Sequence, residues 1–293
     1  MARPARPAAR DTPVPGNNNQ GLDNLQPHAA PTPAQARAAI ARGQFTGNTS
    51  ALCPGYAQAN LVILPRDWAF EFLLFCQRNP KPCPLLEVLD PGEPLTKVIA
   101  DHADVRSDLP RYRVWERGRL VDEPLDITSL WRDDLVSFFL GCSFSFDAAL
   151  QRAGLPVRHL EQGRNVPMYV TNRPNAPAGR LGGPLVVSMR PMTPELVEKA
   201  RRVSETFPGA HGGPVHHGDA REVGIADLGR PDFGDPVELR PGEEPVFWAC
   251  GVTPQAALMQ AKPEFAITHA PGHMFITDLK AEDLDSLGQA QAV

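Results

Sequence analysis

Short apolar runs, each followed by a helix-start signal, organise the C-terminal half of the chain. Residues 184–189 and 246–250 have the length and composition of buried strands, and the Thr-Pro pairs at Thr193 and Thr253 are typical of helix N-termini. A third apolar run, 265–269, follows the second of these helices. Strand, helix and strand in this order predict βαβ units. The expected fold is therefore α/β, with a mostly parallel sheet and flanking helices.

The N-terminal half contains further segments of the same kinds. Residues 60–64 and 85–89 predict buried strands, and the apolar positions within 67–75 predict a helix between them. Alternating segments on both sides of an Arg-Gly pair within 111–122 predict a β-hairpin, and apolar positions within 130–140 predict another helix. We expect the hairpin and this helix to belong to a smaller α+β subdomain.

These elements suggest a division of the chain into three parts. Residues 1–33 are rich in proline and lack hydrophobic periodicity, which predicts a disordered tail. We expect the α/β domain to comprise 34–105 and 185–290, with the α+β subdomain, 106–184, inserted between these two segments.

Composition narrows the possible functions. The 293 residues carry a net charge of −5, which gives no basic surface for nucleic acid. No apolar run reaches the ~18–20 residues that a membrane span needs. The five cysteines are scattered and form no CxxC pair, which favours a reducing, cytoplasmic setting. The expected partner is a small-molecule substrate, and self-association into a homo-oligomer is left open.

The turn at 269–278 concentrates chemically useful side chains. His269 ends the predicted strand, and Pro271-Gly272 excludes a continuous helix between it and His273. Asp278 follows five residues later. These three side chains leave the binding of a divalent metal ion open, although their spacing matches no specific metal signature. The sequence by itself requires no cofactor.

The predicted parallel sheet would gather distant residues at one crevice, because ligands of open α/β sheets bind beyond the carboxyl ends of the strands. Those ends carry Arg190, Cys250 and His269. Gly251 and Thr253 would add backbone N–H groups at a helix N-terminus, where a carboxylate is favoured. Cys250 is placed either as an activated nucleophile or as a buried structural thiol, and the sequence leaves both open.

Two loops supply further binding candidates. Arg164 and Asn165 offer a guanidinium fork and an amide, with a surface ion pair as the alternative for the arginine. Ser143 and Ser145 belong either to a polar binding loop or to ordinary turn hydrogen bonding. A second loop rich in histidine and glycine spans 211–219.

Several long segments together resemble one protein family. The chain is similar, over roughly 34–290, to a bacterial family of hydro-lyases that also includes the D-glutamate cyclase domain of vertebrate mitochondria. The resemblance implies addition or removal of water on a small amino or hydroxy acid, above all the closure of D-glutamate to 5-oxo-D-proline. The segments that carry it are 55–65, 76–86, 141–146, 164–169, 187–191, 248–255 and 268–273.

That chemistry needs a base, an acid and donors for a tetrahedral oxyanion. Mapped onto this sequence, the resemblance implies that His269 and His273 serve as base and acid. Arg164 or Arg190 would hold the substrate carboxylate, and backbone N–H groups of 251–253 would stabilise the oxyanion. Two alternatives are a non-catalytic protein that binds a small acid and a metal-dependent amide hydrolase.

Overall fold

The computed structural model describes residues 30–286. The first helix, α1 (Pro33–Ala41), begins with a capping box, in which the Thr32 hydroxyl accepts a hydrogen bond from the main-chain N–H of Gln35. Most of the predicted tail, 1–33, lies outside the described residues. Within the described part of the chain, no helix is long and apolar enough to cross a membrane.

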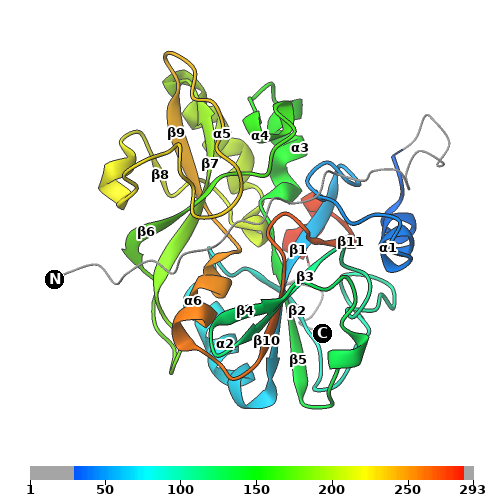
Figure 1. The fold of residues 1–293 in the computed structure, drawn as a ribbon. Helices are drawn as coiled ribbons and strands as arrows, with labels where there is room; N and C mark the ends of the chain where they lie inside the picture. Colours follow the sequence, from blue (N-terminus) through cyan, green and yellow to red (C-terminus); the bar gives the residue numbers. More distant parts are fainter. Residues whose placement is uncertain (1–29, 287–293) are drawn as a thin grey trace.

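Two antiparallel sheets form the framework (Figure 1). The first has the spatial order β2 (Leu85–Val88), β5 (Leu135–Gly141), β1 (Tyr56–Pro65), β10 (Ala266–His269), β3 (Tyr112–Glu116) and β4 (Arg119–Asp122), with β11 (Phe275–Lys280) also paired to β1. The second has the order β6 (Met168–Pro174), β7 (Pro184–Met192), β9 (Glu244–Ala249) and β8 (His216–His217). The predicted hairpin is confirmed, since β3 and β4 pair antiparallel.

The prediction of a mostly parallel sheet is wrong. Strands β7, β9 and β10 and the helices after the first two of them were expected, but these strands are not parallel neighbours in βαβ units. Strand β7 pairs antiparallel with β9 after a long excursion through 206–243. Strand β9 belongs to the second sheet and β10 to the first, so α6 (Thr253–Ala261) links two sheets rather than two parallel neighbours (Figure 1).

The predicted helix over 130–140 is also wrong, because this segment contains strand β5. All seven residues of β5 are buried, and the strand pairs with both β1 and β2. A strand buried on both faces is apolar at every position and lacks the alternation that separates strand from helix. The remaining helices are α2 (Arg66–Arg78), α3 (Phe144–Arg152), α4 (Arg158–Glu161) and α5 (Pro194–Glu205).

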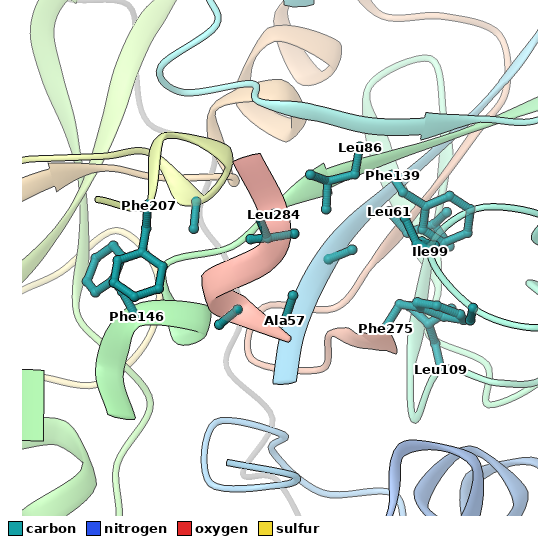
Figure 2. Packing of buried hydrophobic residues seen from close by; sticks show 14 of the residues in the cluster. Ala57, Leu61, Leu86, Ile99, Leu109, Phe139, Phe146, Phe207, Phe275 and Leu284 are labelled. Carbon is teal, nitrogen blue, oxygen red and sulfur yellow. The ribbon is translucent and has the colours of Figure 1, made fainter. Parts of the chain in front are cut away.

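Helices α3 and α4 bridge the two sheets. Helix α3 contacts β1 of the first sheet and α5, and α4 contacts β7 of the second. The largest hydrophobic cluster follows the same path (Figure 2). Leu61, Phe139 and Phe275 pack together at the first sheet, while Phe146 of α3 and Phe207 lie toward the second. The two sheets therefore share one core.

The predicted strands at 60–64, 184–189, 246–250 and 265–269 lead us to expect eight residues near their centres in the core, and this is largely confirmed. Leu185 is only half-buried. The other members are fully buried: Val62, Ile63, Val186, Val187, Phe247, Trp248 and Ile267.

Replacing Trp248 with alanine is expected to lower the free energy of unfolding by about 3–5 kcal/mol. The indole is fully buried, and its Nε1 donates a hydrogen bond to the Ser204 hydroxyl at 2.9 Å, so truncation leaves a cavity and removes this hydrogen bond. Chemical denaturation of the variant measures this. A change below about 0.5 kcal/mol would contradict the placement of Trp248 in the core.

Candidate active site

A buried ion pair between Arg190 and Asp147 lies where α3 meets the second sheet. The Nε and Nη2 atoms of Arg190 are 2.8 and 2.7 Å from Oδ1 of Asp147. Two hydroxyls complete the surroundings, since Arg190 also donates to Oγ of Ser143 at 3.2 Å and to Oγ of Ser188 at 3.3 Å. The arginine is fully buried and the aspartate almost so. Buried charges persist when they are paired in this way.

His159 of α4 extends this network. Its Nε2 lies 3.2 Å from Oδ2 of Asp147, and its ring stacks on Phe144. Both ring nitrogens are buried, and neither makes a hydrogen bond of standard geometry with the described residues, so the contact of Nε2 with Asp147 is a close electrostatic one. An imidazole with one nitrogen on a carboxylate and the other unoccupied has the arrangement of a general base held by an orienting aspartate.

The electrostatics of the network fix its protonation state. Burial opposes ionisation of Asp147, but the interactions with Arg190 and His159 together outweigh it and hold the pKa of this carboxyl below its ordinary value. Burial lowers the pKa of His159, and the carboxylate of Asp147 offsets this only in part. At neutral pH the cluster therefore contains a charged arginine, a charged aspartate and a neutral histidine.

Local sequence explains how Asp147 reaches this position. It lies in the first turn of α3, where a negative charge is favoured by the helix dipole. Phe146 and Trp248 place their rings 5.0 and 5.4 Å from the guanidinium carbon of Arg190, which shields the pair from water.

A cleft of about 300 Å³ opens beside Asp147. It lies between the segment 50–56 and one face of α3, and Gln58, Phe144 and Leu160 also line it. Its volume is at the lower end of the range for small-molecule sites, about 300–1,000 Å³. The cleft therefore suits a ligand of amino-acid size.

Two buried thiols lie close to the ion pair. Cys142 and Cys250 belong to one apolar cluster with Phe144 and Met274, and the charge of Arg190 acts on both sulfur atoms. Burial raises the pKa of Cys250 to about 11 and raises the pKa of Cys142 as well. Both thiols are therefore protonated at neutral pH, which favours the structural alternative for Cys250 over the nucleophile.

His269 lies inside the first sheet. Its Nδ1 accepts a hydrogen bond from the Leu61 main-chain N–H at 3.1 Å, and the side-chain nitrogen of Gln255 is 3.4 Å from its Nε2. Burial lowers the pKa of His269 to about 4. Both ring nitrogens thus have neighbours from the surrounding elements, which favours a structural role.

Replacing His269 with asparagine is therefore expected to lower the melting temperature while turnover per folded molecule stays within a few-fold of the original. The physical reason is the loss of the contacts that the imidazole makes with Leu61 of β1 and with the side chain of Gln255 in α6. Thermal melts and turnover measured on one preparation decide the point. A stable variant with strongly reduced turnover would instead place His269 in the reaction.

Asn165 and His273 meet at the turn between β10 and β11. A Cβ atom at Gly272 would lie 2.8 Å from Nδ2 of Asn165, so the amide packs directly against the turn. His273 directs Nδ1 to the Pro271 carbonyl at 3.0 Å, and burial lowers its pKa. The structure thus brings Asn165 to the predicted histidine turn.

The third residue of the metal hypothesis, Asp278, is engaged elsewhere. Its two carboxylate oxygens each accept a hydrogen bond from Arg37 at 2.9 Å. Within the part of the chain that the structure describes, no group of three or more His, Cys, Asp or Glu residues is arranged to hold a metal ion. The residues present therefore do not fit a metal centre built on His269, His273 and Asp278.

Ser145 and Arg164 both bind the main chain. The Ser145 hydroxyl accepts a hydrogen bond from the N–H of Gln58 at 3.0 Å. Arg164 is exposed and donates to the carbonyl of Pro236. Ser145 thus joins α3 to β1, which is a contact between distant segments rather than a hydrogen bond within a turn.

Gly251 and Thr253 attach the start of α6 to both sheets. The Thr253 hydroxyl accepts from the N–H of Val186 in β7 at 3.1 Å. A Cβ atom at Gly251 would lie 2.0 Å from the side-chain nitrogen of Asn60 in β1, so only glycine allows this approach. Both residues therefore position the junction between the sheets.

Asp147 and His159 were missed at the sequence level. Asp147 interrupts an otherwise apolar helical face, and a charged residue at such a position is a signal for a buried, paired group. His159 gave no local signal, because its partner is distant in the sequence and the packing of α4 brings them together.

Comparison with known proteins decides the family. A family profile described as D-glutamate cyclase matches residues 136–278. A protein of Streptomyces avermitilis is 60% identical, over 89% of this chain and 95% of its own length. Proteins of Rubrobacter xylanophilus and Bacillus licheniformis are 63% and 56% identical, over 85% and 87% of this chain and 96% and 97% of their own lengths. All three carry the name "Putative hydro-lyase". The chain belongs to this hydro-lyase family.

The matched region of the hydro-lyase contains the whole ion-pair network, from Ser143 and Asp147 through His159 to Arg190. Among solved structures, the hydro-lyase has a TM-score of 0.34 and 10% identity to a nitrogen repressor-like protein of Methanococcus jannaschii, over 84% of this chain and 98% of that one. A likeness this low assigns neither fold nor function.

Proposed function

We propose that this hydro-lyase interconverts D-glutamate and 5-oxo-D-proline plus water, with the Arg190–Asp147–His159 network as its reacting centre. The observation that carries the proposal is that three segments far apart in the sequence meet at this network. Of the segments that resemble the D-glutamate cyclase family, 141–146 supplies Ser143 and Phe146, 187–191 supplies Arg190 itself, and 248–255 begins with Trp248, which covers its guanidinium.

The reaction sets a clear proton requirement. As the α-nitrogen attacks the side-chain carboxyl carbon, a C–N bond forms and a C–O bond of the carboxyl breaks. The ammonium loses two protons, and the departing oxygen takes up two to leave as water. No proton is gained or lost overall, so the centre must carry protons from nitrogen to oxygen.

His159 is the proposed base for the ammonium. Its Nε2 faces Asp147, so the neutral ring carries its proton there and leaves the lone pair of Nδ1 free to accept another. Asp147 stabilises the imidazolium that forms, and Arg190 keeps Asp147 ionised. The positive charge of Arg190 also favours the oxyanion of the tetrahedral intermediate.

The test is incubation of the purified protein with D-glutamate, L-glutamate and both enantiomers of 5-oxoproline, followed by chiral chromatography. We expect interconversion of the D pair alone. Turnover of the L pair would contradict the proposed substrate. Binding of D-glutamate without turnover would contradict the activity and support a small-acid binding protein instead.

A further inference from the structure

His211 is the second buried imidazole near Arg190 and has an unusual backbone. It follows a short helical turn, Pro208–Ala210, and has a φ of 77°, in the left-handed region that non-glycine residues seldom adopt. The side chain is 1% exposed. Its Nδ1 lies 2.8 Å from the carbonyl of Lys81, while its Nε2 is buried without a hydrogen-bond partner among the described residues.

Close packing holds this loop against the end of β5. A Cβ atom at Gly141 would lie 1.7 Å from the carbonyl oxygen of Gly209, so the loop touches the end of β5. The two residues after Gly141 are Cys142 and Ser143, and Ser143 binds Arg190. The turn before His211 therefore packs on the end of the strand that leads to Ser143, and the positive charge of Arg190 acts on the His211 ring.

The surroundings also fix the ring's tautomer and charge. A carbonyl only accepts hydrogen bonds, so Nδ1 carries the proton that is donated to Lys81, and Nε2 keeps its lone pair. Burial lowers the pKa of His211 to about 4, and the nearby positive charges of Arg190 and Lys81 act in the same direction. The ring is thus neutral at pH 7, and a proton that it accepts is readily passed on.

We propose that His211 is the second proton-transfer residue of this centre, taking a proton at Nε2 from the substrate nitrogen and delivering it to the departing oxygen. The inference rests on the function proposed above. It accounts for a left-handed, strained residue with an unpaired buried nitrogen, a combination that persists at functional sites.

The proton balance requires a carrier of this kind. His159 takes the first proton from the ammonium, and the nitrogen of the tetrahedral intermediate still has one proton to lose. His211 accepts that second proton. Each imidazolium then returns its proton to the departing oxygen, so that water leaves and both rings are neutral again.

The variant His211→Asn separates a role in proton transfer from a structural role. Among residues other than glycine, asparagine tolerates the left-handed region best, and its side-chain amide can still donate to the Lys81 carbonyl. The substitution therefore removes only the unpaired nitrogen Nε2. The matched control is His102→Asn, because His102 also has a positive φ, 46°, but is exposed.

We expect His211→Asn to lower kcat with D-glutamate at least about 100-fold, the lower end for a proton-transfer residue, with KM and melting temperature little changed. His102→Asn should match the unaltered protein. Full turnover in a folded His211→Asn variant would overturn this inference alone. Absence of turnover in the unaltered protein would contradict the proposed function, and this inference with it.

Discussion

Replacing His159 with glutamine is expected to lower kcat for D-glutamate by about 10²–10⁴-fold, the usual contribution of a general base. Glutamine is uncharged like the neutral imidazole and retains an amide that can donate to Asp147, so the ion pair with Arg190 stays intact. What disappears is the unpaired Nδ1 nitrogen. Steady-state kinetics on the folded variant measure the effect.

The pH dependence of the unaltered protein gives an independent check. A base must be unprotonated, so kcat/KM should fall as pH decreases through the pKa of His159. Because burial lowers that pKa from its ordinary value of 6.5, the fall is expected below pH 6.5.

For the His159→Gln variant, His269→Asn serves as the comparison for loss of a buried imidazole. Equal turnover in His159→Gln and the unaltered protein would remove His159 from the reaction.

Replacing Arg190 with methionine is expected to lower the free energy of unfolding by about 3–5 kcal/mol at neutral pH and to abolish measurable turnover, because a buried carboxylate loses its partner. Methionine preserves the apolar packing between Phe146 and Trp248. Chemical denaturation measures the loss. A matched control is Arg201→Met, whose exposed ion pairs on α5 are expected to contribute little.

The sign of the pH dependence distinguishes this cause from simple loss of packing. In the unaltered protein the pKa of Asp147 is below its ordinary value of 3.8, so the pair stabilises the fold above that pH and the benefit is lost as pH falls through the folded pKa. In Arg190→Met the buried Asp147 resists ionisation, so its pKa rises. The difference in stability between the two proteins should therefore shrink toward acidic pH. A constant difference would indicate packing alone.

Local structure could be predicted from the sequence, but the arrangement of the strands could not. The strands at 60–64 and 184–189 and the hairpin around Arg117-Gly118 rest on apolar runs and turn residues close in the sequence. Whether β9 and β10 share a sheet depends on packing between distant segments, which no local pattern records. The prediction failed for strand β5, because a strand that is buried at every position shows no alternation of apolar and polar residues.

In the candidate site, too, single residues could be selected from the sequence, but their arrangement could not be predicted. Arg190, Ser143 and Cys250 were selected from the sequence, and the structure brings them together through antiparallel strands rather than the predicted parallel crevice. Asp147 and His159 emerge only when α3 and α4 pack between the two sheets. His269 was chosen because it ends a strand, yet that strand pairs with β1 and β3, which places its ring inside the sheet.

The central claim is that water is removed and added at the His159 centre, and an isotope measurement tests it most directly. D-Glutamate incubated with the protein in ¹⁸O-labelled water should acquire ¹⁸O in its side-chain carboxylate, because each reopening of 5-oxo-D-proline adds one solvent oxygen there. The α-carboxylate should remain unlabelled, and the His159→Gln variant should exchange at least about 100-fold more slowly. Absence of label in the side-chain carboxylate, or equal exchange by the variant, would contradict the account.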